Sequence, residues 1–250
     1  MTPVWFRSTC QRNGIDPSDD QLSQLDRFSA LLLEWNKKIN LISRRDEENI
    51  WVSHILHSVS VLFKLDIPQG ASVLDLGTGG GLPGLPIKIL RSDLDLTLLD
   101  STQKKINVVR EIASDLHLQK IQPVWGRAEE VGRKEEYAHR FDLVIARAVA
   151  SLKDLTGWSV PFLRRQDEGQ TERGEHSNHP TLFAINKPSL VALKGGDLEG
   201  EIRQIGRRAD ITNISIIDLT LEGSNQLEGS EKKLVVVEFG AAGSRKQIDS

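Results

Sequence analysis

The chain has 250 residues, of which 38% are hydrophobic and 27% are charged, and its formal net charge is −3. These values suit a globular protein with one large domain, or with a domain and an appendage, and exclude a strongly basic chain, so that any nucleic-acid partner must be held by a local basic patch. The apolar runs fall far short of the roughly 20 residues that span a bilayer, and the N-terminus has no continuous apolar segment. The one cysteine, Cys10, cannot form an internal disulfide. We therefore expect a cytoplasmic protein that does not contact a membrane.

Residues 18–66 are predicted to be helical. Ser18 and Gln21 have the spacing of a capping box, which starts a helix. Apolar side chains then recur at steps of three and four and form one stripe, at Leu25, Phe28, Leu32, Trp35 and Ile39. A second helical stretch begins near Asp46, and its stripe is Trp51, Ile55, Val59 and Phe63. We interpret these side chains as core and expect residues 1–68 to form an N-terminal helical extension.

From residue 71 onward, short apolar runs alternate with amphipathic stretches. The runs are SVLDL, LTLLD, IQPVW, FDLVIA, LVALK, ITNISIIDL and KLVVVEF. Strands that alternate with helices predict an α/β fold whose sheet is mostly parallel and covered by helices on both faces. The connection between the last two runs, TLEGSNQLEGSEK, is too short for a crossover helix, so we expect an antiparallel C-terminal edge. The sheet domain is placed at residues 69–242.

Two other segments carry little apolar content. Residues 164–180 are predicted to be a polar surface insertion, and residues 243–250 a tail. The histidine pairs His176 and His179, and His54 and His57, lack the thiolate or carboxylate partners of a metal cage. We expect no metal site.

A glycine-rich loop follows the first predicted strand, in VLDLGTGGGLPGLP. The spacing Gly79-x-Gly81-x-x-Gly84 matches the dinucleotide fingerprint, but on its own that match is weak. Asp75 would sit close to a bound pyrophosphate, and repulsion at short range in a partly buried site disfavours it. The alternative pattern, Asp75-x-Gly77-x-Gly79-x-Gly81, suits S-adenosylmethionine, which carries a sulfonium and an ammonium but no phosphate. We therefore interpret the loop as a site for that nucleoside.

Two further strand ends add candidate cofactor ligands. Asp100 ends the second strand, where a carboxylate can accept hydrogen bonds from both ribose hydroxyls, although it could also cap the next helix. The segment GRAEE follows the third strand, and its backbone amide and acid could meet the adenine edge, or could simply begin an exposed helix.

Arg147 lies just beyond the fourth strand, where open α/β sheets carry out their chemistry. The sequence there is Ala-Arg-Ala-Val and not the Asn-Pro-Pro-Tyr-like clamp of many exocyclic-amine methyltransferases. Methylation of pyrimidine carbon needs a cysteine nucleophile, and Cys10 is outside every sheet motif. An acceptor with its own lone pair remains, such as guanine N7, for which catalysis is alignment and desolvation without an acid or base.

Taken together, the motifs closely resemble one family, the bacterial 16S rRNA guanine-N7 methyltransferases, also called the RsmG or GidB family. The resemblance covers roughly residues 20–240 and is carried by WNKKINLISRRD, HILHS, LDLGTGGGLPGLPIKI, LLDSTQKKINVV, ARAVASL and ALKGG. It implies a Rossmann-like class I methyltransferase sheet that transfers methyl from S-adenosylmethionine to one guanine N7 in 16S rRNA. With the loop residues above, the expected cofactor ligands are Asp75, Gly77, Gly79, Gly81, Leu82, Asp100, Ser101, Thr102, Ala128, Glu129 and Arg147.

The chain departs from the family pattern at two positions. Gly80 stands where many relatives have proline, which should loosen the loop. His57 stands where HILDS would have an aspartate, so a role of that acid does not carry over.

An rRNA substrate requires positive charge near the site. We expect phosphate contacts from basic residues in loops or first turns near the strand ends, and from the N-terminal part: Arg44, Arg45, Lys104, Lys105, Arg147 and Lys194. Arg147 and Lys194 are the candidates for positioning the RNA. We expect a monomer that binds 16S rRNA or the small ribosomal subunit. The alternatives are a methyltransferase of another RNA or a small molecule, a nicotinamide or flavin oxidoreductase, and a binding domain without catalysis.

Overall fold

The computed structural model describes residues 4–165, 182–196, 198–206, 208–223 and 232–240. The expected insertion at 164–180, apart from its first two residues, and the tail at 243–250 lie outside the described residues, as do His176 and His179.

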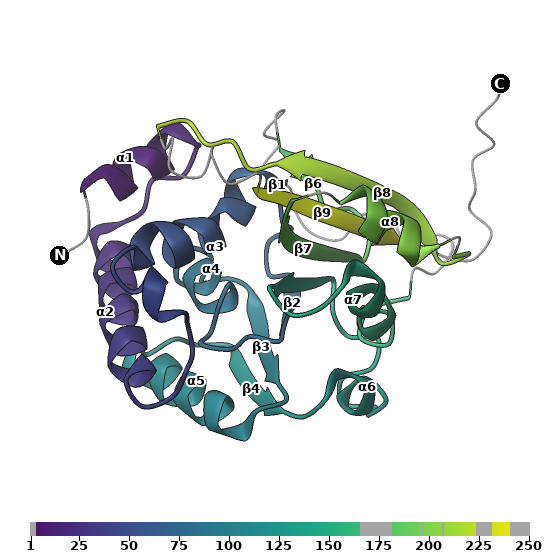
Figure 1. The fold of residues 1–250 in the computed structure, drawn as a ribbon, viewed down its shortest axis with the longest axis horizontal. Helices are drawn as coiled ribbons and strands as arrows, with labels where there is room; N and C mark the ends of the chain where they lie inside the picture. Colours follow the sequence, from purple (N-terminus) through teal and green to yellow (C-terminus); the bar gives the residue numbers. More distant parts are fainter. Residues whose placement is uncertain (1–3, 166–181, 197, 207, 224–231, 241–250) are drawn as a thin grey trace.

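A seven-stranded sheet forms the centre of the molecule (Figure 1). Its strands, in chain order, are β2 (Ser72–Leu76), β3 (Asp95–Asp100), β4 (Ile121–Trp125), β5 (Leu143–Arg147), β7 (Ser189–Gly195), β8 (Ile211–Asp218) and β9 (Lys232–Phe239). Their spatial order is β4-β3-β2-β5-β7-β9-β8. The first five in that order are parallel, whereas β9 is antiparallel to both β7 and β8. The parallel sheet and its antiparallel edge were both predicted.

Alternating side chains enter two hydrophobic clusters, one on each face of the sheet. Val73 of β2 packs into the cluster that contains the N-terminal helices, whereas its neighbour Leu74 packs into the other. The first face is covered by α2 (Asp19–Asn36), α4 (Gly84–Leu90) and α5 (Gln103–Asp115), and the second by α6 (Ala128–Val131), α7 (Leu152–Ser159) and α8 (Glu199–Ile205) (Figure 1). Burial on both faces explains why the strands are nearly continuous apolar runs.

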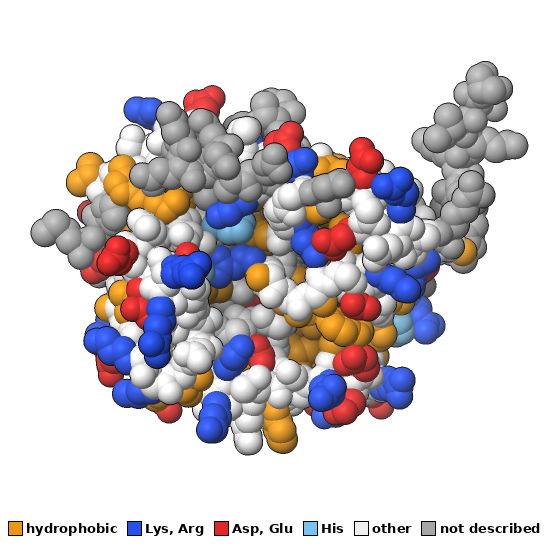
Figure 2. Space-filling view, in the orientation of Figure 1, with side chains coloured by type: hydrophobic (Ala, Val, Ile, Leu, Met, Phe, Trp, Pro, Cys, Tyr) orange, Lys and Arg blue, Asp and Glu red, His pale blue; other side chains and the backbone are white. Residues whose placement is uncertain are grey.

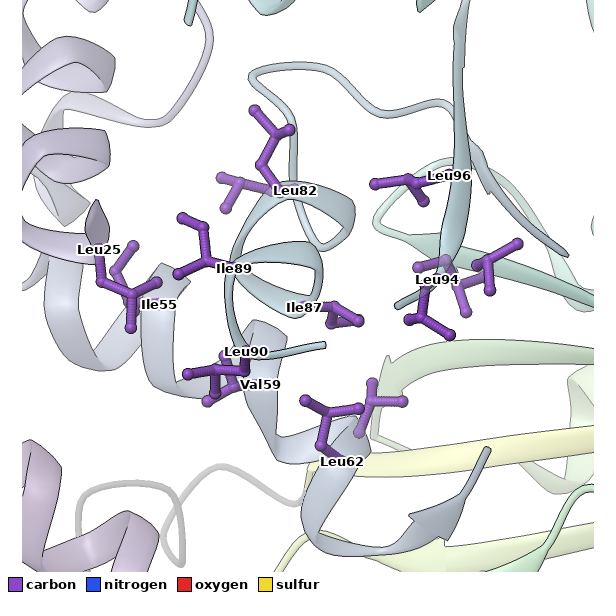
Figure 3. Packing of buried hydrophobic residues seen from close by; sticks show 14 of the residues in the cluster. Leu25, Ile55, Val59, Leu62, Leu82, Ile87, Ile89, Leu90, Leu94 and Leu96 are labelled. Atoms are coloured by element: carbon purple, nitrogen blue, oxygen red, sulfur yellow. The ribbon is translucent and has the colours of Figure 1, made fainter. Parts of the chain in front are cut away.

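Helix α2 begins as the sequence predicts. Ser18 Oγ accepts from the amide of Gln21 at 3.2 Å, and Gln21 Oε1 accepts from the amide of Ser18 at 3.0 Å. The predicted stripe faces inward, and Leu25 lies beside Ile55, with Ile89 of α4 pointing toward them (Figure 3). The N-terminal helices therefore share one core with the sheet.

The second helical stretch changes its hydrogen-bonding pattern along its length. It runs as a short 3-10 turn, η1 (Arg44–Asp46), then a π-helix, η2 (Trp51–Leu56), then α3 (His57–Val59) and a final 3-10 turn, η3 (Ser60–Phe63). The stripe residues Ile55, Val59 and Phe63 are buried as expected.

Two features were not predicted. Helix α1 (Val4–Arg12) precedes the capping box, and β1 (Leu65–Asp66) pairs in parallel with β6 (Phe183–Ala184) as a separate two-stranded sheet. None of the described helices is both long and apolar enough to cross a membrane.

Candidate active site

The glycine loop after β2 needs its glycines. Gly77, Gly79 and Gly81 have φ of +73°, +57° and +87°, which is the left-handed region that side chains disfavour. A Cβ at Gly77 would also lie 2.6 Å from Cγ2 of Val149. No side chains at these three glycines cover the backbone of the loop, which lies at the carboxyl end of the sheet, where open α/β sheets bind ligands.

Asp75 organises this loop from beneath. Its carboxylate is fully buried, and Oδ2 accepts from Thr78 Oγ1 at 2.7 Å and from the amide of Gly84 at 2.9 Å. Burial raises the pKa of Asp75 to about 6, against the opposing effects of these hydrogen bonds and of Arg147. Oδ1 has no hydrogen-bond partner within the described residues. A buried acceptor without a donor is costly, so Oδ1 is available to a cationic or hydrogen-bonding ligand.

Asp100 joins the loop to the start of α5. Oδ2 accepts from the amide of Gly79 at 3.0 Å, and Oδ1 accepts from the amide of Thr102 at 2.8 Å. Thr102, and not Asp100, is the N-cap residue of α5. The carboxylate therefore does more than cap α5, because it accepts hydrogen bonds from the loop after β2 and from the residues after β3, and it keeps lone pairs for a ligand.

The remaining predicted cofactor residues lie along the same edge of the sheet. Leu82 is buried, Ser101 and Thr102 are exposed after β3, and Ala128 and Glu129 open α6 after β4. Strands β4, β3, β2 and β5 are adjacent and parallel, so their carboxyl ends bring these residues and Arg147 to one edge. The structure thus groups the predicted set, and the binding role of each member stays a prediction.

Gly80 packs against the N-terminal helices. A Cβ there would lie 2.7 Å from Cδ1 of Leu32 in α2 and 3.2 Å from Cβ of Leu41. The expected loosening at this position is therefore limited by close contact with α2.

Arg147 is bound by the N-terminal part of the chain. Its Nη1 donates to the carbonyl of Ser53 at 3.3 Å, and its Nη2 is 3.0 Å from Nδ1 of His54. Burial lowers the pKa of Arg147 to about 10, opposed by the carboxylates of Asp75 and Asp46. The contact with His54 was missed, although HILHS was among the motifs of the family resemblance.

His54, His57 and Lys232 lie close enough to Arg147 for its positive charge to affect their pKa values. Burial lowers the pKa of His54 to about 4 and that of His57 to about 2, and the positive charges of Arg147 and Lys232 act in the same direction. Both rings are therefore neutral at pH 7. Figure 2 shows His and Lys or Arg side chains together near the middle of this face. Among the described residues, no three His, Cys, Asp or Glu side chains are grouped as metal ligands.

Lys194 does not converge with Arg147. Its Nζ donates to the carbonyl of Ala150 at 2.7 Å and to Oε2 of Glu201 at 2.8 Å. In the sheet Arg147 pairs with Leu193, which faces the N-terminal helices, so Lys194 faces α7 and α8 on the opposite side. Arg147 and Lys194 therefore lie on opposite faces of the sheet, and we expect Lys194 to hold β7 against α7 and α8 and not to position the RNA.

Three of the four other expected RNA-binding cations are exposed to solvent. Arg44 and Arg45 are exposed in η1, Lys104 is exposed in the first turn of α5, and Lys105 is half-buried.

Trp125 was not predicted as a site residue. It ends β4 opposite Asp100, and 56% of its surface is exposed. Its Nε1 donates to the carbonyl of Ser101 at 3.1 Å.

The sheet order, the bare loop and its two strand-end carboxylates define the fold of Rossmann-like class I S-adenosylmethionine-dependent methyltransferases. One solved structure with this fold is a predicted O-methyltransferase from Agrobacterium tumefaciens, with a TM-score of 0.52 and 14% identity over 77% of this chain and 82% of that chain. Residues 21–182 match the GidB family, described as rRNA small subunit methyltransferase G. The chain belongs to this family, S-adenosylmethionine is its cofactor, and the resemblance seen in the sequence is confirmed.

Relatives in that family cover the chain to different extents. The ribosomal RNA small subunit methyltransferase G of Lactococcus lactis subsp. cremoris is 39% identical over 87% of this chain and 91% of its own length. The protein of the same name from Moorella thermoacetica is 40% identical over 60% of this chain and 63% of its own length.

Proposed function

We propose that the protein transfers the methyl group of S-adenosylmethionine to N7 of a guanine in 16S rRNA, acting as a cytoplasmic monomer. One observation carries the cofactor part: the fully buried Asp75 keeps Oδ1 without a partner beneath a loop of left-handed glycines. A carboxylate so placed favours the sulfonium and ammonium of this cofactor and disfavours a pyrophosphate. The residues present therefore fit the cofactor.

The residues that would hold the cofactor divide by the group they contact. Asp75 and the glycine loop would face its methionine part, Asp100 its ribose, and Ala128 and Glu129 its adenine. When bound, the cofactor supplies an electrophilic methyl group on sulfur.

The acceptor is assigned by the chemistry that the chain can support. Cys10 is buried in α1, and burial raises the pKa of its thiol to about 12, so it is no nucleophile for carbon methylation. His54 cannot serve as a base at Nδ1, because that atom is bonded to Arg147. N7 of guanine needs neither group, since its lone pair is already available, and the protein need only align it and exclude water.

The experiment offers radiolabelled S-adenosylmethionine together with small ribosomal subunits, naked 16S rRNA, or a pool of small metabolites. We expect label in 16S rRNA at one position, where borohydride and aniline cleave the chain because N7-methylguanosine is labile to this treatment. Asp100→Ala is the control, in which less label should be incorporated at a limiting cofactor concentration. Label in another RNA or in a small molecule, or label that resists this cleavage, would contradict the proposal. Gel filtration or sedimentation of the protein tests the monomer.

A further inference from the structure

The guanidinium of Arg147 is held by a turn of helix far away in the sequence. Arg147 ends β5 beside β2, so it lies at the strand ends where the cofactor loop begins. Its guanidinium makes two hydrogen bonds to η2, one to the carbonyl of Ser53 and one to the ring of His54. Guanidinium has five N–H donors, so donors remain for a ligand.

The bond to His54 requires a particular state of the imidazole. Arginine can only donate, so Nδ1 of His54 must be the acceptor and Nε2 must carry the proton. Nε2 lies 3.6 Å from Oδ2 of Asp46, too far for a hydrogen bond but suitable for electrostatic attraction. Burial keeps the ring neutral and the positive charges of Arg147 and Lys232 act in the same direction, whereas Asp46 favours the protonated form.

The backbone of η2 places both acceptors. Trp51–Leu56 is a π-helix, a rare and wider turn that is found disproportionately at functional sites. The carbonyl of His54 accepts from Ser58 Oγ at 2.6 Å, which ties this turn to α3. His54 is only 9% exposed, so its ring has little freedom to leave Arg147.

Arg147 also lies near Asp75, because Asp75 pairs with Ile145 in the sheet and Arg147 is two residues further along β5 on the same face. The positive charge of Arg147 favours the ionised form of Asp75, while Asp100 disfavours it. If Arg147 moved into solvent, the pKa of Asp75 would rise further, because burial would remain and the attraction would weaken. The orientation of one guanidinium thus affects the charge of the carboxylate beneath the cofactor loop.

We propose that His54 is a positioning residue, which holds Arg147 beside Asp75 and thereby keeps the cofactor loop competent to bind for methyl transfer. The inference rests on the proposed function for its choice of cofactor. It assigns a task to the N-terminal helical part, which supplies the acceptors for an arginine of the sheet.

The test compares His54→Ala with His54→Asn. The Oδ1 of asparagine can take the place of Nδ1 and accept from Arg147, whereas alanine cannot. His57→Asn is the matched control, because His57 is equally buried one turn later and no hydrogen bond joins it to Arg147 among the described contacts. Folding of each variant is checked by circular dichroism and thermal melting.

The readout is the binding of S-adenosylhomocysteine, measured by calorimetry from pH 5 to 8, together with kcat on the RNA. In His54→Ala we expect the pH midpoint of binding to rise by about half a unit or more, and kcat to fall about tenfold. His54→Asn and His57→Asn should keep the midpoint of the unchanged protein. Adding His54→Ala to Arg147→Lys should change kcat less than about twofold, because the two residues act as one unit.

Some outcomes would overturn the proposal. These are an unmoved midpoint in a folded His54→Ala variant, an equal shift in His57→Asn, or additive losses in the double variant. If His54→Ala does not fold, a His54→Asn variant whose midpoint rises also contradicts it. Failure of the proposed function is separate, since it would appear as absent cofactor binding in the unchanged protein or as label outside 16S rRNA.

Discussion

The ammonium of Lys194 lies 2.8 Å from Oε2 of Glu201, so the end of β7 is tied to α8. The same carboxylate oxygen accepts from the amide of Leu152, which begins α7. Glu201 therefore holds together the last parallel strand and two helices, and the pKa of Glu201 is lowered by its hydrogen bonds to Lys194 and Leu152, against its partial burial.

This ion pair changes what is expected of Lys194→Ala. We expect a loss of about 1 kcal/mol in the free energy of unfolding, since Glu201 loses its cation, and an unchanged salt dependence of RNA binding. Chemical denaturation and RNA titrations at several salt concentrations measure the two effects. Glu201→Gln is the matched control and should lose a similar amount of stability. A shallower salt dependence in Lys194→Ala alone would restore Lys194 as an RNA contact.

Asp75 is expected to make cofactor binding depend on pH. Its pKa is raised from 3.8 to about 6 in the free protein, so near pH 5 it is mostly protonated and near pH 7 mostly ionised. A bound cation favours the ionised form, and the affinity for S-adenosylmethionine should therefore increase as the pH rises through about 6. In Asp75→Asn this increase should vanish. Calorimetry from pH 5 to 8 measures the affinity of both proteins for S-adenosylmethionine. If the affinity of Asp75→Asn rises with pH as steeply as that of the unchanged protein, Asp75 is not the titrating group.

Asp100→Ala is expected to weaken S-adenosylhomocysteine binding at least about tenfold with the fold intact. Each lost hydrogen bond to a charged acceptor costs about 1.5–3 kcal/mol before water compensates. The variant also frees the amides of Gly79 and Thr102, which loosens the loop. Asp100→Asn separates these effects, because its amide keeps one acceptor for the backbone. Unchanged affinity in Asp100→Ala would remove this residue from the cofactor site.

Nicotinamide and flavin dinucleotides are expected not to bind. Both carry a pyrophosphate that would lie near the buried carboxylate of Asp75. Repulsion between the two negative groups at such short range opposes binding by an energy on the order of kcal/mol. Titration of the unchanged protein with either dinucleotide should give no saturable signal, while S-adenosylhomocysteine should saturate. Tight dinucleotide binding would return the loop to the oxidoreductase alternative.

Local patterns made most of the fold predictable. Each sheet strand is an apolar run with clear bounds, and Ser18 with Gln21 marks the start of α2 through contacts three residues apart. The pairing of β1 with β6 was not accessible, because two-residue strands more than a hundred positions apart leave no periodicity. Helix α1 was missed for a related reason, since it is short and only Phe6, Thr9 and Cys10 are buried.

Some residues of the candidate site could be predicted from the sequence, and some of its contacts could not. Asp75, the glycines and Asp100 follow strands directly, so their common edge could be predicted from topology. The bond between Arg147 and His54 spans 93 positions and depends on how η2 packs against β5. The side taken by Lys194 follows from strand alternation once Arg147 is paired with Leu193, but that register is known only from the folded sheet.

The two buried histidines are expected to make the protein sensitive to acid. The pKa of His57 is lowered from 6.5 to about 2, and that of His54 to about 4. Below about pH 6.5 the unfolded chain therefore binds protons at these histidines that the folded chain does not bind. Stability is therefore fully present above about pH 6.5 and is lost as the pH falls. Asp75 opposes this between about 6 and 3.8, because its raised pKa lets the folded state bind a proton first.

A difference measurement isolates the contribution of His57. Relative to His57→Asn, the unchanged protein should lose about 1.4 kcal/mol of unfolding free energy for each pH unit between about 6 and 4, because one proton is refused by the native state. Urea denaturation at several pH values gives this slope directly. The neighbouring charges, Arg147, Lys232 and His54, are the same in both proteins, so their effects largely cancel. A slope equal in both proteins would mean that His57 accepts a proton in the folded state, and that burial and the nearby cations do not keep it neutral.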